Sequence, residues 1–314
     1  MELKKDMEDQ AEKLREIMRE KRTAPVQERT LGRQGRKPPA LDGSDSDAKR
    51  TRIIAVTSAK GGVGKTNLSV NMALAFARLG KKVVVMDADL GLANVNVMFN
   101  IVPKYNLYHV IKKQKTIREI LVETDYGISI VAGASGFSQI ANLEENDRQN
   151  FINELDTLSF ADIIIIDTAA GVSSNVLDFV AAADDAIIVT TPEPTAITDA
   201  YALIKIVATE YDTINIKLQL VVNRARGAAE GKSVADKITG VAGQFLYINV
   251  DYLGCIYDDL VVPGAVRQQK PFMVLDPKSK ASICVQHLVE RMDKTKPKKS
   301  GGIGAMFKKI FSRS

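Results

Sequence analysis

A glycine-rich run flanked by lysines offers the clearest chemistry in this chain. Residues 60–66 read Lys-Gly-Gly-Val-Gly-Lys-Thr and follow an apolar run at 53–57 that predicts a β-strand. Glycines at such a turn let backbone N–H groups converge on phosphate oxygens, and the N-terminus of the next helix adds a favourable partial charge. The run therefore predicts a phosphate-binding loop between a strand and a helix. The alternative is a glycine turn that merely joins the two elements.

Individual positions of this loop have distinct expected roles. Lys65 is expected to bind the β- and γ-phosphates of a nucleotide, and the Thr66 hydroxyl is expected to ligate Mg²⁺. Ala59 stands where the strict motif has its first glycine. The expected nucleotide-binding residues of the loop are Gly61, Gly62, Val63, Gly64, Lys65, Thr66 and Asn67.

Acidic residues follow two other apolar runs. Asp87 and Asp89 come after the run at 83–86, and Asp167 ends the run at 163–166. Acids at the carboxyl ends of parallel strands face the ligand crevice of an α/β sheet. We therefore expect Asp167 to hold Mg²⁺ as the Walker B acid. For Asp87 and Asp89, a helix cap or a loop pair is the alternative.

With these residues in view, the loop resembles the deviant Walker A motif of the MinD/ParA family of ATPases. The resemblance implies that Lys60 reaches across a nucleotide-sandwich dimer to the partner's phosphates. A second cation there would stabilise the charge of the transition state, as an arginine finger does. The catalytic residues implied are Lys60, Lys65 and Asp89, of which Asp89 orients the attacking water.

The same resemblance assigns the remaining site residues. It places Asp87 near the magnesium shell with Thr66 and Asp167, and it places Asn223, followed by Arg224, at the adenine edge. A turn-forming asparagine is the alternative. The family pattern after the Walker B acid is Asp-x-Pro-Ala-Gly, whereas this chain has Asp-Thr-Ala-Ala-Gly at 167–171. Gly171 still permits a backbone amide to approach the γ-phosphate, but the proline that stiffens this switch is missing.

Short apolar runs alternate with helical patterns from residue 52 to residue 292. Near-continuous Val and Ile content favours strands that helices cover on both faces. The expected strands are 53–57, 83–87, 128–132, 163–167, 186–191, 218–223 and 250–255, and the expected helices are 65–79, 146–158, 174–183, 195–210, 231–246 and 279–291. These patterns predict an α/β domain with a mostly parallel sheet and flexible N- and C-terminal extensions, and the resemblance implies a MinD-like P-loop NTPase fold.

The region before this domain divides in two. Residues 1–20 carry apolar residues at helical spacing, which predicts a short helix that docks on a partner. Residues 21–51 are rich in Arg, Pro, Gly and Ser and predict a flexible linker.

Within 1–20, the run Asp-Gln-Ala-Glu-Lys-Leu-Arg at 9–15 resembles an element of the flagellar-number ATPases of the FlhG (FleN, YlxH) type. The run Thr-Pro-Glu-Pro-Thr at 191–195 also resembles a segment of these ATPases. There the first element stimulates the signal-recognition-type GTPase FlhF. The partner-binding residues implied are Asp9, Gln10, Ala11, Leu14 and Arg15; a coiled-coil or irrelevant tail is the alternative.

The C-terminal region, 293–314, has a basic spacer followed by an amphipathic segment. Its apolar residues recur at i, i+3, i+4, i+7 and i+8, with lysines off that face. Such a helix is typical of an anchor at an anionic membrane surface. The membrane-contacting residues expected are Ile303, Met306, Phe307, Lys308, Lys309, Ile310 and Phe311. The alternative is a helix packed on its own domain, and both arrangements could alternate.

Charge and composition narrow the function classes. The 314-residue chain has a net charge of +5, yet residues 293–314 alone hold seven Lys or Arg against one acid. The mildly acidic domain that remains makes nucleic acid an unexpected partner. The two cysteines are far apart and have no metal-ligand spacing, which disfavours a disulfide framework or an iron–sulfur site. No signal sequence or membrane span is apparent, so we expect a cytoplasmic protein that binds the inner face of the membrane peripherally.

Together with these features, the resemblance implies a slow, switch-type ATPase with ATP and Mg²⁺ as ligands. ATP would promote a homodimer that binds membrane and an FlhF-type GTPase, with a C-ring component or a transcriptional regulator as further possible partners. Its output would be the number and placement of flagella. Three alternatives remain: a cell-division or chromosome-partition ATPase of the same family, an iron–sulfur carrier relative, and an adaptor that binds nucleotide without hydrolysing it.

Overall fold

The computed structural model describes residues 50–89, 94–133, 144–211, 213, 216–295 and 301–312. The partner-binding element expected at 9–15 and nearly all of the linker expected at 21–51 lie outside these residues, as does 296–300. Within the described residues, no helix is both long and apolar enough to span a bilayer.

The described strands form one eight-stranded sheet in the order β3-β4-β2-β5-β1-β6-β7-β8. All neighbours pair in parallel except β3, which runs antiparallel to β4 at one edge. The central strands are buried along their whole length because helices cover both faces. The strand bounds are β1 Arg52–Ser58, β2 Val83–Ala88, β3 Leu121–Glu123, β4 Ile128–Val131, β5 Ile163–Ala170, β6 Asp185–Thr190, β7 Lys217–Ala225 and β8 Asp251–Tyr257.

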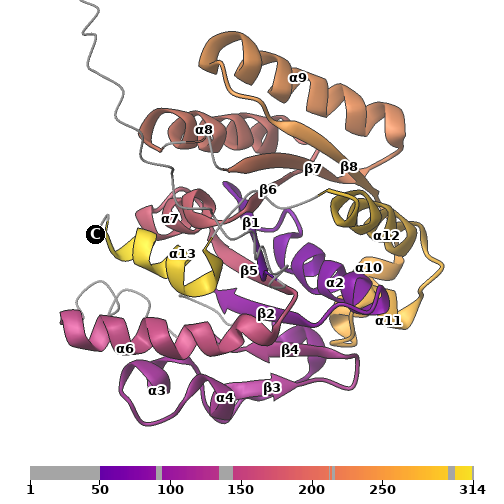
Figure 1. Ribbon diagram of the computed structural model, residues 1–314. Coiled ribbons are helices and arrows are strands. Elements are labelled where there is room, and N and C mark those ends of the chain that lie inside the picture. Colours follow the sequence, from indigo (N-terminus) through magenta and orange to yellow (C-terminus); the bar gives the residue numbers. More distant parts are fainter. Residues whose placement is uncertain are drawn as a thin grey trace, which may run out of the picture. The chain divides into compact units, whose positions relative to one another are not determined.

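Helices α2 and α12 cover one face of the sheet, and α6, α7 and α13 lie on the other (Figure 1). The remaining helices pack around these layers or connect them to strands. The bounds are α2 Lys65–Arg78, α3 Leu107–Ile111, α4 Ile117–Ile120, α6 Glu145–Asp156, α7 Ser174–Ala182, α8 Pro194–Glu210, α9 Ala228–Leu246, α10 Val261–Arg267, α11 Phe272–Leu275, α12 Lys280–Asp293 and α13 Gly302–Phe311, with 3₁₀ turns at Val97–Phe99 and Thr157–Phe160.

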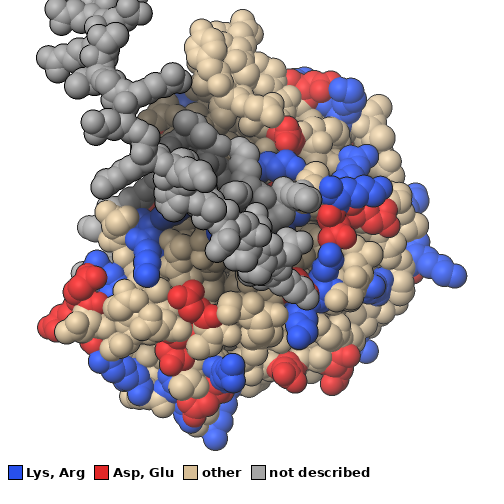
Figure 2. Space-filling view, in the orientation of Figure 1, with Lys and Arg blue, Asp and Glu red and all other residues tan. Residues whose placement is uncertain are grey.

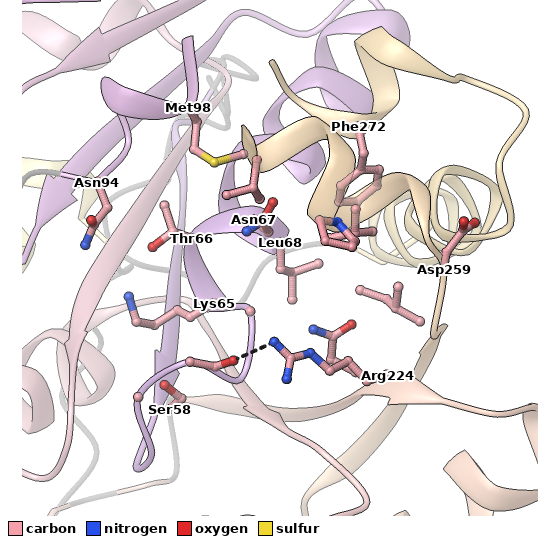
Figure 3. A pocket seen from close by; sticks show the side chains of 18 of the residues that line it. Ser58, Lys65, Thr66, Asn67, Leu68, Asn94, Met98, Arg224, Asp259 and Phe272 are labelled. Atoms are coloured by element: carbon pink, nitrogen blue, oxygen red, sulfur yellow. Dashed lines mark hydrogen bonds between the residues drawn. The ribbon is translucent and has the colours of Figure 1, made fainter. Parts of the chain in front are cut away.

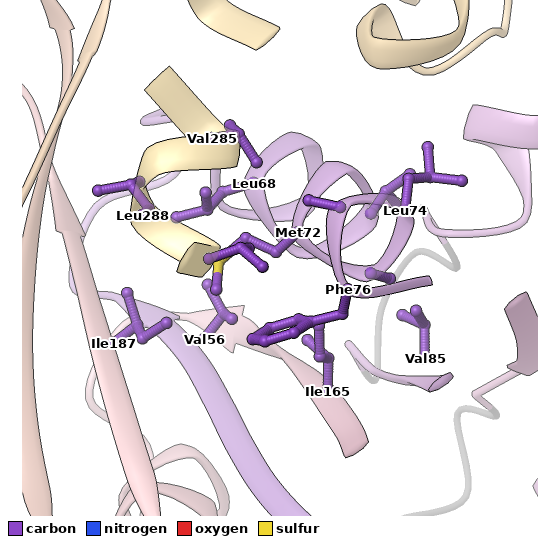
Figure 4. Packing of buried hydrophobic residues seen from close by; sticks show 14 of the residues in the cluster. Val56, Leu68, Met72, Leu74, Phe76, Val85, Ile165, Ile187, Val285 and Leu288 are labelled. Atoms are coloured by element: carbon purple, nitrogen blue, oxygen red, sulfur yellow. The ribbon is translucent and has the colours of Figure 1, made fainter. Parts of the chain in front are cut away.

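The core alternates between the two faces of each strand. Val56 and Ile165 point toward α2, where Met72 and Phe76 pack against them (Figure 4). Their neighbours Ile164 and Ile166 belong to the cluster beneath α6, α7 and α13. Because successive side chains of a strand point to opposite faces, the unbroken apolar runs of the sequence supply both clusters at once. This packing fixes the carboxyl ends of β1, β2 and β5 side by side.

The expected fold class is confirmed, and all seven expected strands and six expected helices are present with shifted ends. The elements that the sequence patterns missed are short: β3 has three residues, and α3, α4, α10 and α11 have four to seven. Segments of this length show less than two helical turns of periodicity, so their patterns are not diagnostic.

Two of the shifted boundaries have a local cause. Helix α9 starts at Ala228 rather than 231, and Gly231 lies inside it, where a Cβ would collide with Cys255 and with the Tyr252 hydroxyl. This glycine permits close helix–sheet contact and does not mark a helix start. Strand β5 continues past Asp167 to Ala170, which pairs with Ser58. No proline interrupts the strand in this stretch.

Candidate nucleotide-binding site

The phosphate loop connects β1 to α2 at the carboxyl edge of the sheet. Gly62 and Gly64 have φ values of +77° and +99°, which favour glycine over other residues. A Cβ on Gly64 would also collide with the amide nitrogen of Asn223. The loop therefore needs its glycines both for its own turns and for the contact with the end of β7.

Asp167 is the centre of a buried polar cluster beneath this loop. Its Oδ1 lies 3.2 Å from the Lys65 ammonium and accepts a hydrogen bond of 2.8 Å from the Ser69 hydroxyl. Its Oδ2 accepts a 2.7 Å hydrogen bond from the Thr66 hydroxyl. The carboxylate is fully buried, so these partners stabilise its charge. Sequence reasoning named Lys65, Thr66 and Asp167 but missed Ser69, which stands one turn after Lys65.

The Thr66 and Asp167 pair fits Mg²⁺. A hydroxyl and a carboxylate oxygen are hard ligands of the kind this ion prefers, and Mg²⁺ sites in nucleotide enzymes take one or two protein ligands besides phosphate and water. The hydrogen bond that now joins Thr66 to Asp167 shows that both oxygens face the same point. Their assignment as metal ligands remains a prediction.

Asp87 lies beside Asp167 in the register of β2 and β5. Its carboxylate accepts backbone N–H bonds of 3.0 Å from Asp89, 2.8 Å from Asn94 and 3.0 Å from Val95. Burial and, to a smaller extent, the charge of Asp167 raise the pKa of Asp87 to about 6, although these hydrogen bonds act to lower it. Asp87 thus anchors both ends of the segment that carries Asp89, and its place in the magnesium shell remains a prediction.

A cavity of about 950 Å³ opens beside the loop (Figure 3). Its volume suits a nucleotide-sized ligand. Nine residues of the predicted site line it: Gly61, Gly62, Gly64, Lys65, Thr66, Asn67, Asp89, Asn223 and Arg224. Lys60, Val63, Asp87, Asp167 and Gly171 are not among its lining residues.

The opposite wall of the cavity comes from a part of the chain that no motif marked. It begins at the last residue of β8 and includes Tyr257, Asp258, Asp259, Val262, Pro263, Val266, Arg267 and Phe272. The adjacent acids 258–259 were the available signal, because they directly follow a parallel strand. The apolar residues of this wall give the cavity a surface suited to a flat base, opposite the phosphate loop.

Asn223 and Arg224 lie near the end of β7 and hold the loop through its carbonyl groups. The Asn223 amide donates a 2.7 Å hydrogen bond to the Val63 carbonyl, and Arg224 donates one of 3.0 Å to Gly62, drawn in Figure 3. Arg224 has a φ of +55°, an uncommon value for a residue with a side chain. Both residues therefore tie the loop to the sheet, and adenine recognition by Asn223 remains a prediction.

Lys60 points to a partner within its own chain. Its ammonium lies 2.8 Å from Glu193 Oε2 and donates a 2.8 Å hydrogen bond to the Thr195 hydroxyl. Glu193 is the residue before α8, and the hydrogen bond from Lys60 holds the pKa of its carboxyl below the usual value. The contact is half exposed, so it is open to exchange. Sequence analysis identified both the phosphate loop and the run at 191–195, but it did not predict that they contact each other.

Gly171 lies where the switch meets the loop. Its φ of +110° requires glycine, and its N–H donates a 2.9 Å hydrogen bond to the Ser58 carbonyl. The contact with γ-phosphate that was expected of Gly171 would need this N–H to change partners.

Comparisons with known proteins identify the family of the chain. Residues 51–220 match a family model described as "AAA domain". The chain is 39% identical to antiactivator FleN of Pseudomonas aeruginosa, over 77% of this chain and 86% of that protein. It is 38% identical to the flagellum site-determining protein YlxH of Helicobacter pylori, over 70% of this chain and 74% of that protein.

Solved structures show the same fold. The septum site-determining protein MinD of Pyrococcus horikoshii, complexed with Mg-ADP, superimposes with a TM-score of 0.63 at 24% identity, over 78% of this chain and 96% of that one. Fold, loop motif and sequence identity agree, and the chain belongs to the MinD/ParA-type family of P-loop ATPases, in the branch that includes FleN and YlxH.

Proposed function

We propose that this chain is an ATP-dependent, dimerising ATPase that regulates the number and placement of flagella. The observation that carries the proposal is the cluster of Lys65, Thr66 and Asp167 beside the cavity. With ATP bound, Mg²⁺ would neutralise phosphate charge between Thr66 and Asp167, and Lys65 would bind the β- and γ-phosphates. The flagellar output rests on the two flagellar relatives.

Two residues would complete the hydrolytic site. Asp89 lines the cavity and would orient the attacking water. Lys60 would leave Glu193 and reach the phosphates of a second copy, where its charge stabilises the transition state. Hydrolysis would then dissolve the dimer, which makes the protein a switch.

An Asp89→Ala variant tests the hydrolytic switch. Loss of a residue that positions the nucleophile is expected to lower the ATP hydrolysis rate by about 100-fold or more and to lengthen the lifetime of the ATP-bound dimer. Asp236→Ala, which removes an exposed acid on α9, is the matched control. If Asp89→Ala hydrolyses ATP and dissociates like the parent protein, the protein is a nucleotide-binding adaptor instead.

We further propose that α13 attaches the dimer to an anionic membrane. Its apolar face is buried against its own domain, which is the alternative arrangement of the sequence analysis, while Lys308 and Lys309 are exposed. Docking would hold the helix in the resting state and dimerisation would release two anchors, which together bind far more tightly than one. Deletion of 302–314 is expected to abolish ATP-dependent sedimentation with phosphatidylglycerol vesicles. Unchanged sedimentation would remove the membrane role.

Residues 9–15 support an FlhF-type GTPase as partner by resemblance alone, because they lie outside the described residues. A peptide of residues 1–22 is expected to raise the hydrolysis rate of such a GTPase. A flat response across a concentration series would count against this partner.

Nucleic acid is not part of the proposal. Figure 2 shows basic and acidic side chains interspersed over the face in view, without one broad basic surface. A cell-division ATPase stays the second candidate within the family, and the GTPase assay separates it from the flagellar role.

A further inference from the structure

Helix α13 is held by aromatic contacts along its buried face. The Phe307 ring lies 5.9 Å from that of Phe151 on α6 and 6.0 Å from that of Phe179 on α7, both nearly perpendicular to it. The Arg148 guanidinium lies 5.3 Å from the centre of the Phe311 ring. Figure 1 shows α13 alongside α6 and α7. These contacts bury one face of the helix but leave the polar groups of its first turn to be satisfied.

The first turn of α13 has no cap of its own. Gly301 is the residue before the helix and offers no side chain, and no side-chain hydrogen bond to the cap is present there. Instead, Asp156 Oδ1 accepts a 2.9 Å hydrogen bond from the N–H of Gly304, the third residue of the helix. This N–H is one that a capping Ser, Thr or Asp ordinarily bonds. A neighbouring helix therefore supplies the cap.

The position of Asp156 is unfavourable for its own helix. It is the last residue of α6, near the negative partial charge of that helix end, and it directly precedes the 3₁₀ turn Thr157–Phe160. The N-terminus of α13 carries the opposite partial charge and favours the carboxylate. Asp156 thus gains from α13 only while α13 is docked.

Gly304 leaves room for this contact because it has no Cβ. A Cβ at position 304 would collide with the carboxylate of Asp156, so a larger residue would force the Asp156 side chain away from the end of α13. Glycine also weakens an isolated helix. The glycine therefore costs helix stability and gives close approach in return.

We propose that Asp156 is an inter-helix cap that controls how firmly α13 stays docked. Asp156 is an exposed residue, so water competes for its carboxylate and the contact is modest. Undocking releases the apolar face of α13 together with its cap, while Lys308 and Lys309 are accessible beforehand. The consequence for lipid binding rests on the membrane role proposed above; the docking control itself does not.

Amide hydrogen exchange of the full chain without nucleotide tests the cap. Asp156→Ala is expected to speed exchange across 302–311 about threefold or more, in line with the usual effect of losing a cap, and to leave 65–78 in α2 unchanged. Asp147→Ala, which removes an acid from the same helix where it pairs with Lys113, is the matched control and should exchange like the parent.

Gly304→Ala is an independent test, because helix propensity and the proposed contact predict opposite changes in the exchange rate. Alanine strengthens a helix, so helix propensity alone would slow exchange in 302–311. The proposed contact predicts faster exchange, because the methyl group displaces Asp156. Parent-like or slower exchange in both variants, or equal acceleration in Asp147→Ala, overturns the proposal.

Vesicles of phosphatidylcholine with phosphatidylglycerol separate this inference from the membrane role. Asp156→Ala is expected to sediment with them in the absence of ATP more than the parent does. If exchange accelerates but neither this variant nor the ATP-loaded parent sediments, the cap stands and the membrane role falls.

Discussion

The first and last described helices of the domain, α2 and α13, differ in how much of each helix is buried. Ten of the 14 residues of α2 are buried, against five of the 10 residues of α13. Helix α2 follows directly from the phosphate loop and lies between the sheet and α12, so polar and apolar residues alike are enclosed. A helix buried all round cannot leave without unfolding the core, whereas a helix with one buried face can separate as a unit.

This difference suits the work proposed for each helix. Helix α2 fixes Lys65, Thr66 and Ser69 against Asp167, and phosphate binding needs groups held within fractions of an ångström. Helix α13 carries no group of the nucleotide site. Its contacts with the rest of the domain include aromatic and aliphatic packing, the approach of Arg148 to the Phe311 ring and the hydrogen bond from Gly304 to Asp156. All of them lie on one face of the helix, which is compatible with a docked and a free state.

The largest expected effect is that of a substitution in α2, the more deeply buried of the two helices. Lys65→Met removes the cation that faces both Asp167 and the phosphates, and is expected to lower ATP hydrolysis by about 100-fold or more. It also leaves the buried Asp167 carboxylate without its ion partner, which should destabilise the nucleotide-free protein by about 3 kcal/mol. Steady-state kinetics and urea unfolding measure the two effects. Lys81→Met, in an exposed ion pair just after α2, is the control and should change neither.

A matched pair of phenylalanines sharpens the comparison itself. Phe76 in α2 and Phe307 in α13 are both almost fully buried. Phe76→Ala should lower the free energy of unfolding by about 3–5 kcal/mol, because it leaves a cavity in the core. Phe307→Ala should lower it by less than half as much, because α13 can undock and the loss is then limited to its docking energy.

Urea unfolding followed by circular dichroism compares the two variants, and hydrogen exchange shows where the change occurs. Exchange should rise throughout the domain for Phe76→Ala and mainly in 302–311 for Phe307→Ala. Equal losses of stability in the two variants would mean that α13 unfolds only with the core, and the contrast between the helices would be wrong.

The smallest expected effect concerns Lys60, the phosphate-loop lysine whose contact with Glu193 is half exposed. Glu193→Gln weakens the contact that holds Lys60 within its own chain, so dimerisation should need a severalfold lower ATP concentration, as measured by light scattering. An exposed ion pair contributes little, which limits the size of the shift. Glu210→Gln, at the other end of α8, is the control. A higher ATP requirement in Glu193→Gln would show that Glu193 assists Lys60 in the dimer instead.

Sequence reasoning was most successful where neighbouring residues encode local structure. The glycines at 62 and 64, the apolar runs and the spacing of Ile303, Met306 and Phe307 act within a few residues, so each can be read from the chain directly. The position of Asp167 also followed, because an acid at the end of a parallel strand must face the same edge as the loop.

The amino-acid sequence by itself determined the fold class, the phosphate loop, the acid that completes it and the amphipathic character of α13. Only the tertiary structure decided that Lys60 meets Glu193, that Asp156 caps α13, and that residues after β8 form the far wall of the cavity. The physical reason is distance along the chain: these partners lie 133 and 148 residues apart in the first two cases. The order of strands and the choice of helix faces, which no local pattern carries, bring them together.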